Sequence, residues 1–168
     1  MKMANGGFNP AYNIQLAVDT ASRFIVGSYV VNKGNDIGQL IPMFEKLIKN
    51  YNKTPEEYLV DQGYLDKGKI AQVQKSGCKV YVNPKPNEKV NTISEEGELT
   101  EWRNRMETDE AKEIYKDRAS NSEWANAGMR NRGLKQFLVR GIKNVQSVIS
   151  IHVLTHNILR AIKLGYAW

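Results

Sequence analysis

Residues 58–82 read YLVDQGYLDKGKIAQVQKSGCKVYV, and this stretch decides the fold class. A short apolar run at 58–60 ends at Asp61, a helical pattern covers 67–76, and a second apolar run covers 79–82. Strand, helix and strand joined by short connections form a parallel βαβ crossover. The sequence therefore predicts an α/β fold, with Asp61 at the C-terminal end of a buried strand, where such sheets present polar groups to ligands.

The residues before this stretch predict a hairpin followed by a helix. Residues 12–18 alternate with the two-residue period of a half-buried strand, and 24–31 is rich in aromatic and β-branched side chains. We therefore expect an antiparallel β-hairpin over 12–31. Apolar residues at helical spacing predict a helix from Ile37 to about residue 50, with Pro42 tolerated near its first turn.

The residues after this stretch have mostly helical patterns. A polar segment with two prolines, 83–94, predicts a loop. Three helical segments follow, from about 94 to 113, from 115 to 132 and from 140 to 164, and Gly133 separates the last two. The C-terminal part of the chain is therefore predicted to be helical.

The composition predicts one domain in a reducing compartment. With 168 residues and 41% hydrophobic content, the chain is long enough to bury the core of one domain. Its single cysteine, Cys78, excludes an intramolecular disulfide and is expected to be buried rather than nucleophilic. The N-terminus has no apolar signal-peptide core, and the longest apolar stretch, 145–154, contains polar residues, so we expect a cytoplasmic protein without membrane contact.

The net charge of +6 is unevenly placed. No Asp or Glu follows Glu123, and the basic residues after it are Arg130, Arg132, Lys135, Arg140, Lys143, Arg160 and Lys163. A basic surface suits a polyanion, because each Lys or Arg that neutralises a phosphate releases a condensed counterion. The alternative explanation is an ordinary solvated basic helix face.

Asp61 and Glu123 are candidate metal-binding carboxylates. Two-metal phosphoryl transfer needs carboxylates from separate elements, and nearby cations that hold the scissile strand. Tyr115 and Arg118, three residues apart, share one helical face, and Glu123 and Arg130, seven apart, share another. Taken singly, Asp61 is better explained as a cap or turn residue, and the others as ordinary exposed side chains.

Several segments taken together resemble a known family. In chain order they are PAYNIQLAVD (10–19), VDQGYLDKGKI (60–70), the set Tyr115, Arg118 and Glu123, NRGLKQFLVRGIKNV (131–145) and LTHNILRAI (154–162). Their order and spacing resemble the C-terminal part of DDE transposases encoded by bacterial insertion sequences, over nearly the entire chain.

The resemblance implies an RNase H-like fold, a mixed sheet with flanking helices, that cuts and rejoins DNA with Mg²⁺ (or Mn²⁺) held by two Asp and one Glu. Asp61 resembles the second aspartate and Glu123 the glutamate, so both are the expected catalytic and metal-binding residues. Arg130 stands where the family usually has Lys, which keeps the charge but replaces a point cation with a planar fork. The residues expected to contact DNA are Tyr115, Arg118, Arg130 and Arg132.

Two departures from the family pattern predict weak activity. The family's first aspartate lies on a strand before the hairpin, where this sequence starts, so we expect the first strand to be missing and the metal ion to bind weakly. Asp19 is the only carboxylate near that part of the sheet, but it ends the next strand, so we do not expect it to substitute. Four residues separate Arg118 from Glu123 where the family has three, which puts them about 140° apart unless a π-bulge realigns them.

We interpret 1–168 as a partial DDE catalytic domain, made of the hairpin 12–31, the βαβ unit 58–82 and a helical segment, 95–168, with the glutamate and the basic tail. Its function would be that of the C-terminal part of a transposase that cleaves and joins DNA, inactive as a fragment. The alternative is a non-catalytic DNA-binding remnant that interferes with an intact transposase, and a decayed reading frame is a third possibility. The expected partners are DNA and either a second copy or the full-length transposase, at the nucleoid in a bacterial cytoplasm.

The remaining candidates are better explained by packing. His152 and His156 lie four apart on the last helix, a spacing that can bind a metal, but no third ligand is evident and the helix is strongly apolar. Tyr64 and Trp124, close to the two carboxylates in sequence, can stack on bases. We expect core or partner contacts for the histidines and packing for the aromatic residues.

Overall fold

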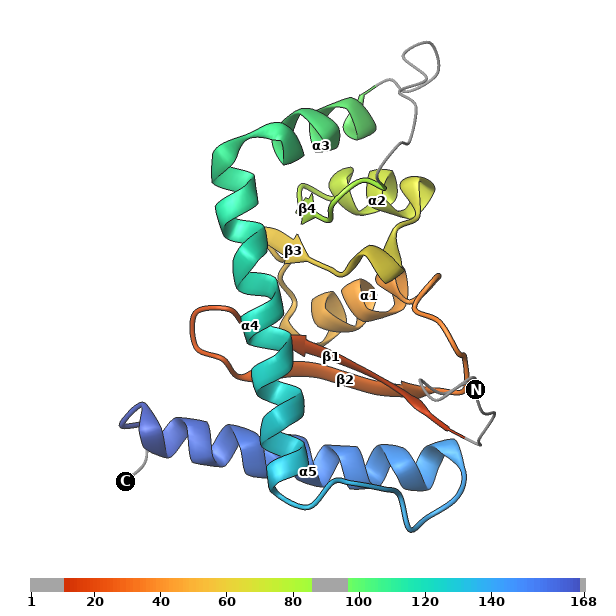
Figure 1. Cartoon of the computed structure of the whole chain (residues 1–168), viewed down its shortest axis with the longest axis vertical. Coiled ribbons are helices and arrows are strands. Elements are labelled where there is room, and N and C mark those ends of the chain that lie inside the picture. Colours follow the sequence, from red (N-terminus) through yellow and green to blue (C-terminus); the bar gives the residue numbers. More distant parts are fainter. Residues whose placement is uncertain (1–10, 86–96, 167–168) are drawn as a thin grey trace. The chain divides into compact units, whose positions relative to one another are not determined.

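The computed structural model describes residues 11–85 and 97–166, apart from the side chains of Ala119 and Ser122 (Figure 1). Length predicts one domain, whereas contacts divide the chain into two compact units: unit 1 combines Met1–Asn35 with Ser120–Trp168, and unit 2 is Asp36–Ala119. The elements in chain order are β1 (Asn13–Val18), β2 (Ile25–Val31), α1 (Leu40–Tyr51), β3 (Glu57–Leu59), the 3₁₀ turn η1 (Gln62–Tyr64), α2 (Lys67–Gln74), β4 (Lys79–Tyr81), α3 (Glu98–Glu107), α4 (Asp109–Asn131) and α5 (Ile142–Lys163). None of the described helices is long and apolar enough to cross a membrane.

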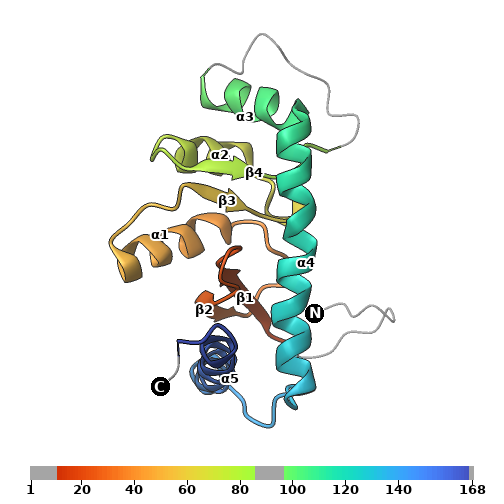
Figure 2. The ribbon, with the colours of Figure 1, turned by 90° about the vertical axis from the view of Figure 1, so that its left-hand side faces the viewer.

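Unit 1 is built on the antiparallel hairpin of β1 and β2, which lies where the alternating pattern predicted it. The register pairs Asn13 with Val31. Apolar side chains of both strands pack against α5, which runs along one face of the hairpin (Figure 2). Gln15 and Ala17, whose side chains alternate with these, are only 2% and 8% exposed, whereas Ile14 and Leu16 are partly buried, so the face with Gln15 is the more deeply buried one.

Two hydrophobic clusters hold unit 1 together. They join β2 to the C-terminal half of α4 (Ile25, Ala125 and Met129) and β2 to α5 (Val30, Val145 and Ile149). Asn157 of α5 adds a polar anchor, because its side-chain amide accepts from the N–H of Ile25 and donates to the carbonyl of Ile25, each at 2.9 Å. These two bonds imitate strand pairing and fix α5 to the start of β2.

The C-terminus of α4 is a Schellman motif, which Gly133 makes possible. The N–H of Leu134 donates to the Met129 carbonyl at 3.1 Å, and that of Gly133 to the Arg130 carbonyl at 3.0 Å. Gly133 has φ +94°, a conformation that strains residues with a Cβ. The predicted helix break at Gly133 is therefore confirmed.

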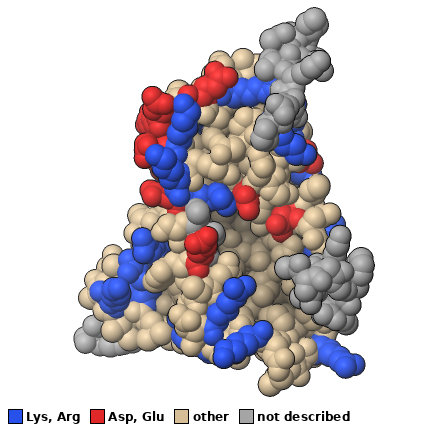
Figure 3. All heavy atoms as spheres, viewed as in Figure 1, with Lys and Arg blue, Asp and Glu red and all other residues tan. Residues whose placement is uncertain are grey.

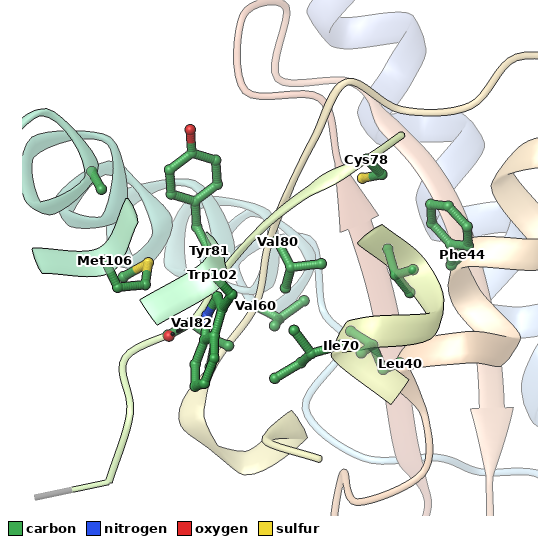
Figure 4. Close-up of a cluster of buried hydrophobic side chains, with 12 residues drawn as sticks. Leu40, Phe44, Val60, Ile70, Cys78, Val80, Tyr81, Val82, Trp102 and Met106 are labelled. Carbon is green, nitrogen blue, oxygen red and sulfur yellow. Dashed lines mark hydrogen bonds between the residues drawn. The ribbon is translucent and has the colours of Figure 1, made fainter. Parts of the chain in front are cut away.

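Unit 2 contains the predicted βαβ crossover. β3 and β4 pair in parallel, with Tyr58 opposite Val80, and α2 connects them. Their apolar side chains form one core with those of α1, α2 and α3 (Figure 4). Trp102 of α3 is fully buried there, and its Nε1–H donates to the Val82 carbonyl at 3.2 Å, which anchors α3 to the end of β4.

The first helix starts later than its apolar spacing predicts. α1 begins at Leu40 rather than Ile37, because the preceding residues form a separate turn. In that turn the N–H of Gln39 donates to the Asp36 carbonyl at 2.9 Å, and Gly38 has φ +91°. The apolar spacing alone did not reveal this turn.

The break between α3 and α4 lies at Thr108 rather than near residue 114. The Thr108 backbone is extended, and its Oγ1 accepts from the N–H of Ala111 at 3.2 Å, as an N-cap does. Asp109 and Glu110 follow in the first turn, where acidic side chains complement the helix dipole. The cap and the two acids were the sequence signal for this helix start.

The described residues form a mixed α/β fold with two small sheets. β1 pairs with β2 and β3 with β4, and no strand within 11–85 or 97–166 joins the two pairs, which belong to different units. The single mixed sheet expected of an RNase H-like fold is therefore not formed by these residues. Local patterns predicted both strand pairs, but whether two pairs join into one sheet depends on tertiary contacts.

Candidate functional site

Asp61 lies where β3 ends. Pairing with β4 continues to Val60, whose N–H donates to the Tyr81 carbonyl at 3.0 Å, and the chain then turns into η1. The Asp61 carboxylate is 60% exposed, and its Oδ1 accepts from the N–H of Gln62 at 2.7 Å. Asp61 therefore caps this turn, as the alternative interpretation of the sequence proposed, and its carboxylate still faces solvent.

Arg118 of α4 reaches the same carboxylate. Its Nη1 lies 3.4 Å from Asp61 Oδ1, and its guanidinium carbon lies 5.1 Å from the centre of the Tyr115 ring. The Arg118 side chain is 25% exposed, and its Nε is buried without a hydrogen-bond partner among the described residues. Because an unpaired buried donor is costly, this guanidinium is suited to one further acceptor.

Tyr115 links Arg118 to the loop after β4. Burial raises the pKa of the Tyr115 phenol, while the Arg118 charge and a hydrogen bond with the Asn83 backbone partly oppose this rise. Gln62 Nε2 also donates to the Asn83 carbonyl, at 3.4 Å. Three predicted site residues, Asp61, Tyr115 and Arg118, thus lie together where the parallel strands end beside α4. The raised pKa keeps the Tyr115 phenol protonated at neutral pH.

Glu123 belongs to a different unit from Asp61, Tyr115 and Arg118. It is exposed, belongs to unit 1 and makes no ion pair with any described residue. α4 is a regular α-helix over 23 residues, so the π-bulge that would realign Glu123 with Arg118 is not present. The five-residue step between them therefore leaves the two side chains about 140° apart around the helix.

The described side chains do not make up a metal site by themselves. No group of three His, Cys, Asp or Glu that could hold a metal ion occurs in the part of the chain that the structure describes. Hard divalent cations need several oxygen ligands, and Asp61 supplies one carboxylate that Arg118 already partly neutralises. Asp19, the candidate substitute, accepts from the N–H of Ser22 at 2.8 Å and from its hydroxyl at 2.5 Å, so it closes the hairpin turn.

His156 is a core residue, as expected. It is 3% exposed, its Nδ1 lies 3.2 Å from Arg132 Nη2, and its Nε2 lies 3.1 Å from the Arg23 carbonyl. Because a guanidinium only donates, Nδ1 is the acceptor and Nε2 carries the proton. Both ring nitrogens are thus engaged, so His156 does not bind a metal together with His152.

The other candidates are mostly packed. Tyr64 is half-buried against the core of unit 2, and Trp124 packs edge-on against the His156 ring. Cys78 is 2% exposed, and burial raises the pKa of its thiol to about 12, which excludes a thiolate nucleophile at neutral pH. Arg130, by contrast, is exposed on the last turn of α4.

A comparison with models of known protein families matches residues 73–162 to the transposase DDE domain. The match spans more than half of the chain. The chain belongs to the DDE transposase family. Membership gives it a transposase-related role in DNA transposition, and DDE domains generally use divalent metal ions. A search of curated proteins and a search of solved structures each found no match.

The DDE transposase match covers only part of the candidate site. Tyr115, Arg118 and Glu123 lie inside the matched span, and Asp61 lies before it. The candidate role of Asp61 therefore rests on its place at the end of β3 and on its contact with Arg118.

Two further arginines of this DDE transposase received no role in the sequence analysis. The guanidinium carbon of Arg23 lies 5.6 Å from the centre of the Trp124 ring, and that of Arg160 lies 5.7 Å from it. Arg160 was named only as part of the basic tail. Nothing in the sequence of the hairpin turn indicated a role for Arg23. Its φ of 61° is a conformation in which Gly or Asn is more usual.

Proposed function

We propose that this DDE transposase takes part in cutting and joining DNA during the transposition of a bacterial insertion sequence. The observation that carries the proposal is the contact of Asp61 with Arg118 beside Tyr115, where β3 ends. A partly exposed arginine next to an exposed carboxylate suits a DNA phosphate as a ligand.

In this proposal Asp61 and Glu123 are the catalytic carboxylates and would bind Mg²⁺ or Mn²⁺. Such an ion would stabilise the charge that develops on the phosphate. The described donors are insufficient for it, because they include no third ligand and the two carboxylates belong to different units. We therefore expect the chain by itself to bind the ion weakly and to cut DNA slowly or not at all.

The cations and the phenol would hold the DNA. Arg118 uses Nη1 for Asp61, and the exposed quarter of its side chain can meet a phosphate oxygen, for which a planar guanidinium is suited. Tyr115 stays protonated because burial raises its pKa, and its hydroxyl can donate to the same phosphate. Arg130 and Arg132 would contact the DNA backbone from unit 1.

The finer features belong to the same proposal. The RNase H-like sheet would be completed by a strand and an aspartate from outside the described residues. The partner would be a second copy or a full-length transposase, at the nucleoid in the bacterial cytoplasm. Exposed apolar side chains along α5 support self-association, because exposed apolar patches mark interfaces; they are Ile151, Leu154, Ile158 and Ile162.

A non-catalytic DNA-binding role is the second candidate. It is favoured by the regular geometry of α4, which turns Glu123 away from Arg118. A chain of this kind would still hold DNA and could occupy the place of an active subunit in an intact transposase oligomer.

A nicking and strand-transfer assay separates the two candidates. The substrate is DNA carrying the element's ends, with Mg²⁺ or Mn²⁺, and the chain is compared with Asp61→Asn and Glu123→Gln. Glu113→Gln is the matched control, since Glu113 is an exposed carboxylate of α4 that pairs with the neighbouring Lys116.

Metal-dependent cutting that both site variants abolish and the control keeps would support the catalytic role. Cutting that Asp61→Asn and Glu123→Gln both retain would refute the assignment of these carboxylates. No cutting, with salt-sensitive DNA binding retained, would support the binding role.

A further inference from the structure

Three arginines gather around Trp124 and His156 in unit 1. Arg23 and Arg160 lie within cation–π range of its ring, at 5.6 and 5.7 Å from the ring centre. His156 packs against the same ring with 4.7 Å between the ring centres, and Arg132 Nη2 lies 3.2 Å from His156 Nδ1. We call these five residues the arginine cluster. The cluster is formed by the hairpin turn (Arg23), α4 (Trp124), the residue that follows α4 (Arg132) and α5 (His156 and Arg160).

Two backbone positions of the cluster have conformations or residues that are unfavourable for folding. Arg23 has φ 61°, a left-handed conformation that strains residues with a Cβ, and its carbonyl accepts from the Nε2–H of His156. Gly128 lies inside α4, where glycine is less favourable than alanine. A Cβ at Gly128 would lie 3.2 Å from Arg132 Nη2, so this glycine leaves room for the guanidinium.

The cluster's positive charges have no counter-ion among the described residues. None of its arginines forms an ion pair there, and the chain has no acidic residue after Glu123. Arg132 Nε is buried without a hydrogen-bond partner in the described part of the chain. Figure 3 shows Lys and Arg side chains on the surface of the α5 region, whereas many of the acidic ones gather over α3 and the first turns of α4.

His156 adds no positive charge to the cluster at neutral pH. Burial lowers its pKa, and the charges of Arg132 and Arg160 lower it further, so the ring is neutral. Half-buried cations that repel one another without a carboxylate between them favour an anionic ligand, because the ligand restores the lost solvation and neutralises the charge.

We infer that the arginine cluster is a binding site for phosphates of the DNA backbone. The inference rests on the proposed function and adds residues of the hairpin and α5 to its DNA contacts. Guanidinium groups bind phosphate oxygens through paired N–H donors, and an indole offers a flat surface for a sugar or an unpaired base. Since such contacts go to the backbone, binding at this site is independent of base sequence.

The test measures the affinity for a short DNA duplex of arbitrary sequence over about 50 to 200 mM salt. The variants are Arg23→Gly and Arg160→Gln, singly and together. Glycine suits the φ of 61° at position 23, so Arg23→Gly removes the charge without straining the turn. Lys143→Gln is the matched control, because it also removes one charge from α5 but lies about 25 Å along the helix from Arg160.

Each arginine variant should lower the slope of log affinity against log salt by about 0.9, and the double variant by about twice that. Lys143→Gln should change the slope by less. DNA should also change the tryptophan fluorescence of the wild type, and Trp124→Phe should remove that change. Circular dichroism of every variant separates the loss of a contact from the loss of the fold.

Folded arginine variants that bind DNA like the wild type, or that weaken binding no more than Lys143→Gln, would overturn the inference. That result would leave the proposed function intact, because the nicking assay tests Asp61 and Glu123 independently. A wild-type chain that binds no DNA would overturn the inference together with the proposed DNA-binding role.

Discussion

Replacing His156 with glutamine should remove a pH dependence from the stability of unit 1. Burial lowers the pKa of His156 in the folded chain, and the charges of Arg132 and Arg160 add to this against the opposing effect of the Arg23 carbonyl. A proton on Nδ1 would also face Arg132 Nη2 at 3.2 Å, so two donors would meet without an acceptor. The unfolded chain therefore binds a proton that the folded chain does not.

The sign and the size of the effect follow from this difference. Because the folded pKa lies below the unfolded value of 6.5, stability is complete above pH 6.5 and is lost as the pH falls towards the folded value. The limiting slope is about 1.4 kcal/mol per pH unit. From about pH 7.5 to 5.5 the free energy of unfolding should fall by about 1.4 kcal/mol if folded His156 stays neutral throughout.

Urea unfolding, followed by circular dichroism at about pH 7.5, 6.5 and 5.5, measures this dependence. The chain has two histidines, so His152→Gln is the matched control and should keep the pH dependence that His156→Gln loses. Equal slopes for the wild type and His156→Gln would refute the reasoning. So would an NMR titration that shows folded His156 gaining its proton above pH 6.5.

Three further substitutions test the core of unit 2, the cap of α4 and the position of the glutamate. Trp102→Ala should destabilise unit 2 by about 3–5 kcal/mol in urea unfolding, because it empties a fully buried position of the core, and a loss below about 1 kcal/mol would contradict that burial. Thr108→Ala should lower the free energy of unfolding by about 1 kcal/mol, because it removes the N-cap of α4, whereas Thr108→Ser keeps a capping hydroxyl and should lose much less. The exchange Ser122→Glu with Glu123→Ser moves the carboxylate to about 40° from Arg118 around the helix, so metal-dependent nicking should rise if the glutamate must share that face. Unchanged nicking would show that this alignment does not limit the reaction.

The elements that the sequence predicted well are those whose signal is local. Alternation over 12–18 and the run over 24–31 specified the hairpin, and Gly133 specified the end of α4, because period and helix ends are set by neighbouring residues. The late start of α1 and the cap at Thr108 were missed, since apolar spacing does not show a turn or cap at a helix start.

The candidate site was predictable only in part. Asp61 could be singled out because a polar residue after a buried strand is visible in the sequence, whereas its contact with Arg118, 57 residues later, comes only from the fold. The meeting of Arg23 and Arg160 at Trp124 could not be found, because these residues are far apart in the chain and converge only through packing. The division of the described strands into two small sheets was likewise beyond local patterns.

The proposed role of Glu123 concerns DNA cleavage and not DNA binding. In the proposed catalytic role, the carboxylate of Glu123 would act together with Arg118, and the five-residue step on a regular helix sets the two side chains about 140° apart around the axis. Binding has no such requirement, since Arg23 and Arg160 act on phosphates through charge and reach Trp124 whatever the direction of Glu123. Glu123→Gln should therefore leave the affinity for DNA unchanged. Removal of the charges of Arg23 and Arg160 should instead weaken every step of transposition that needs bound DNA.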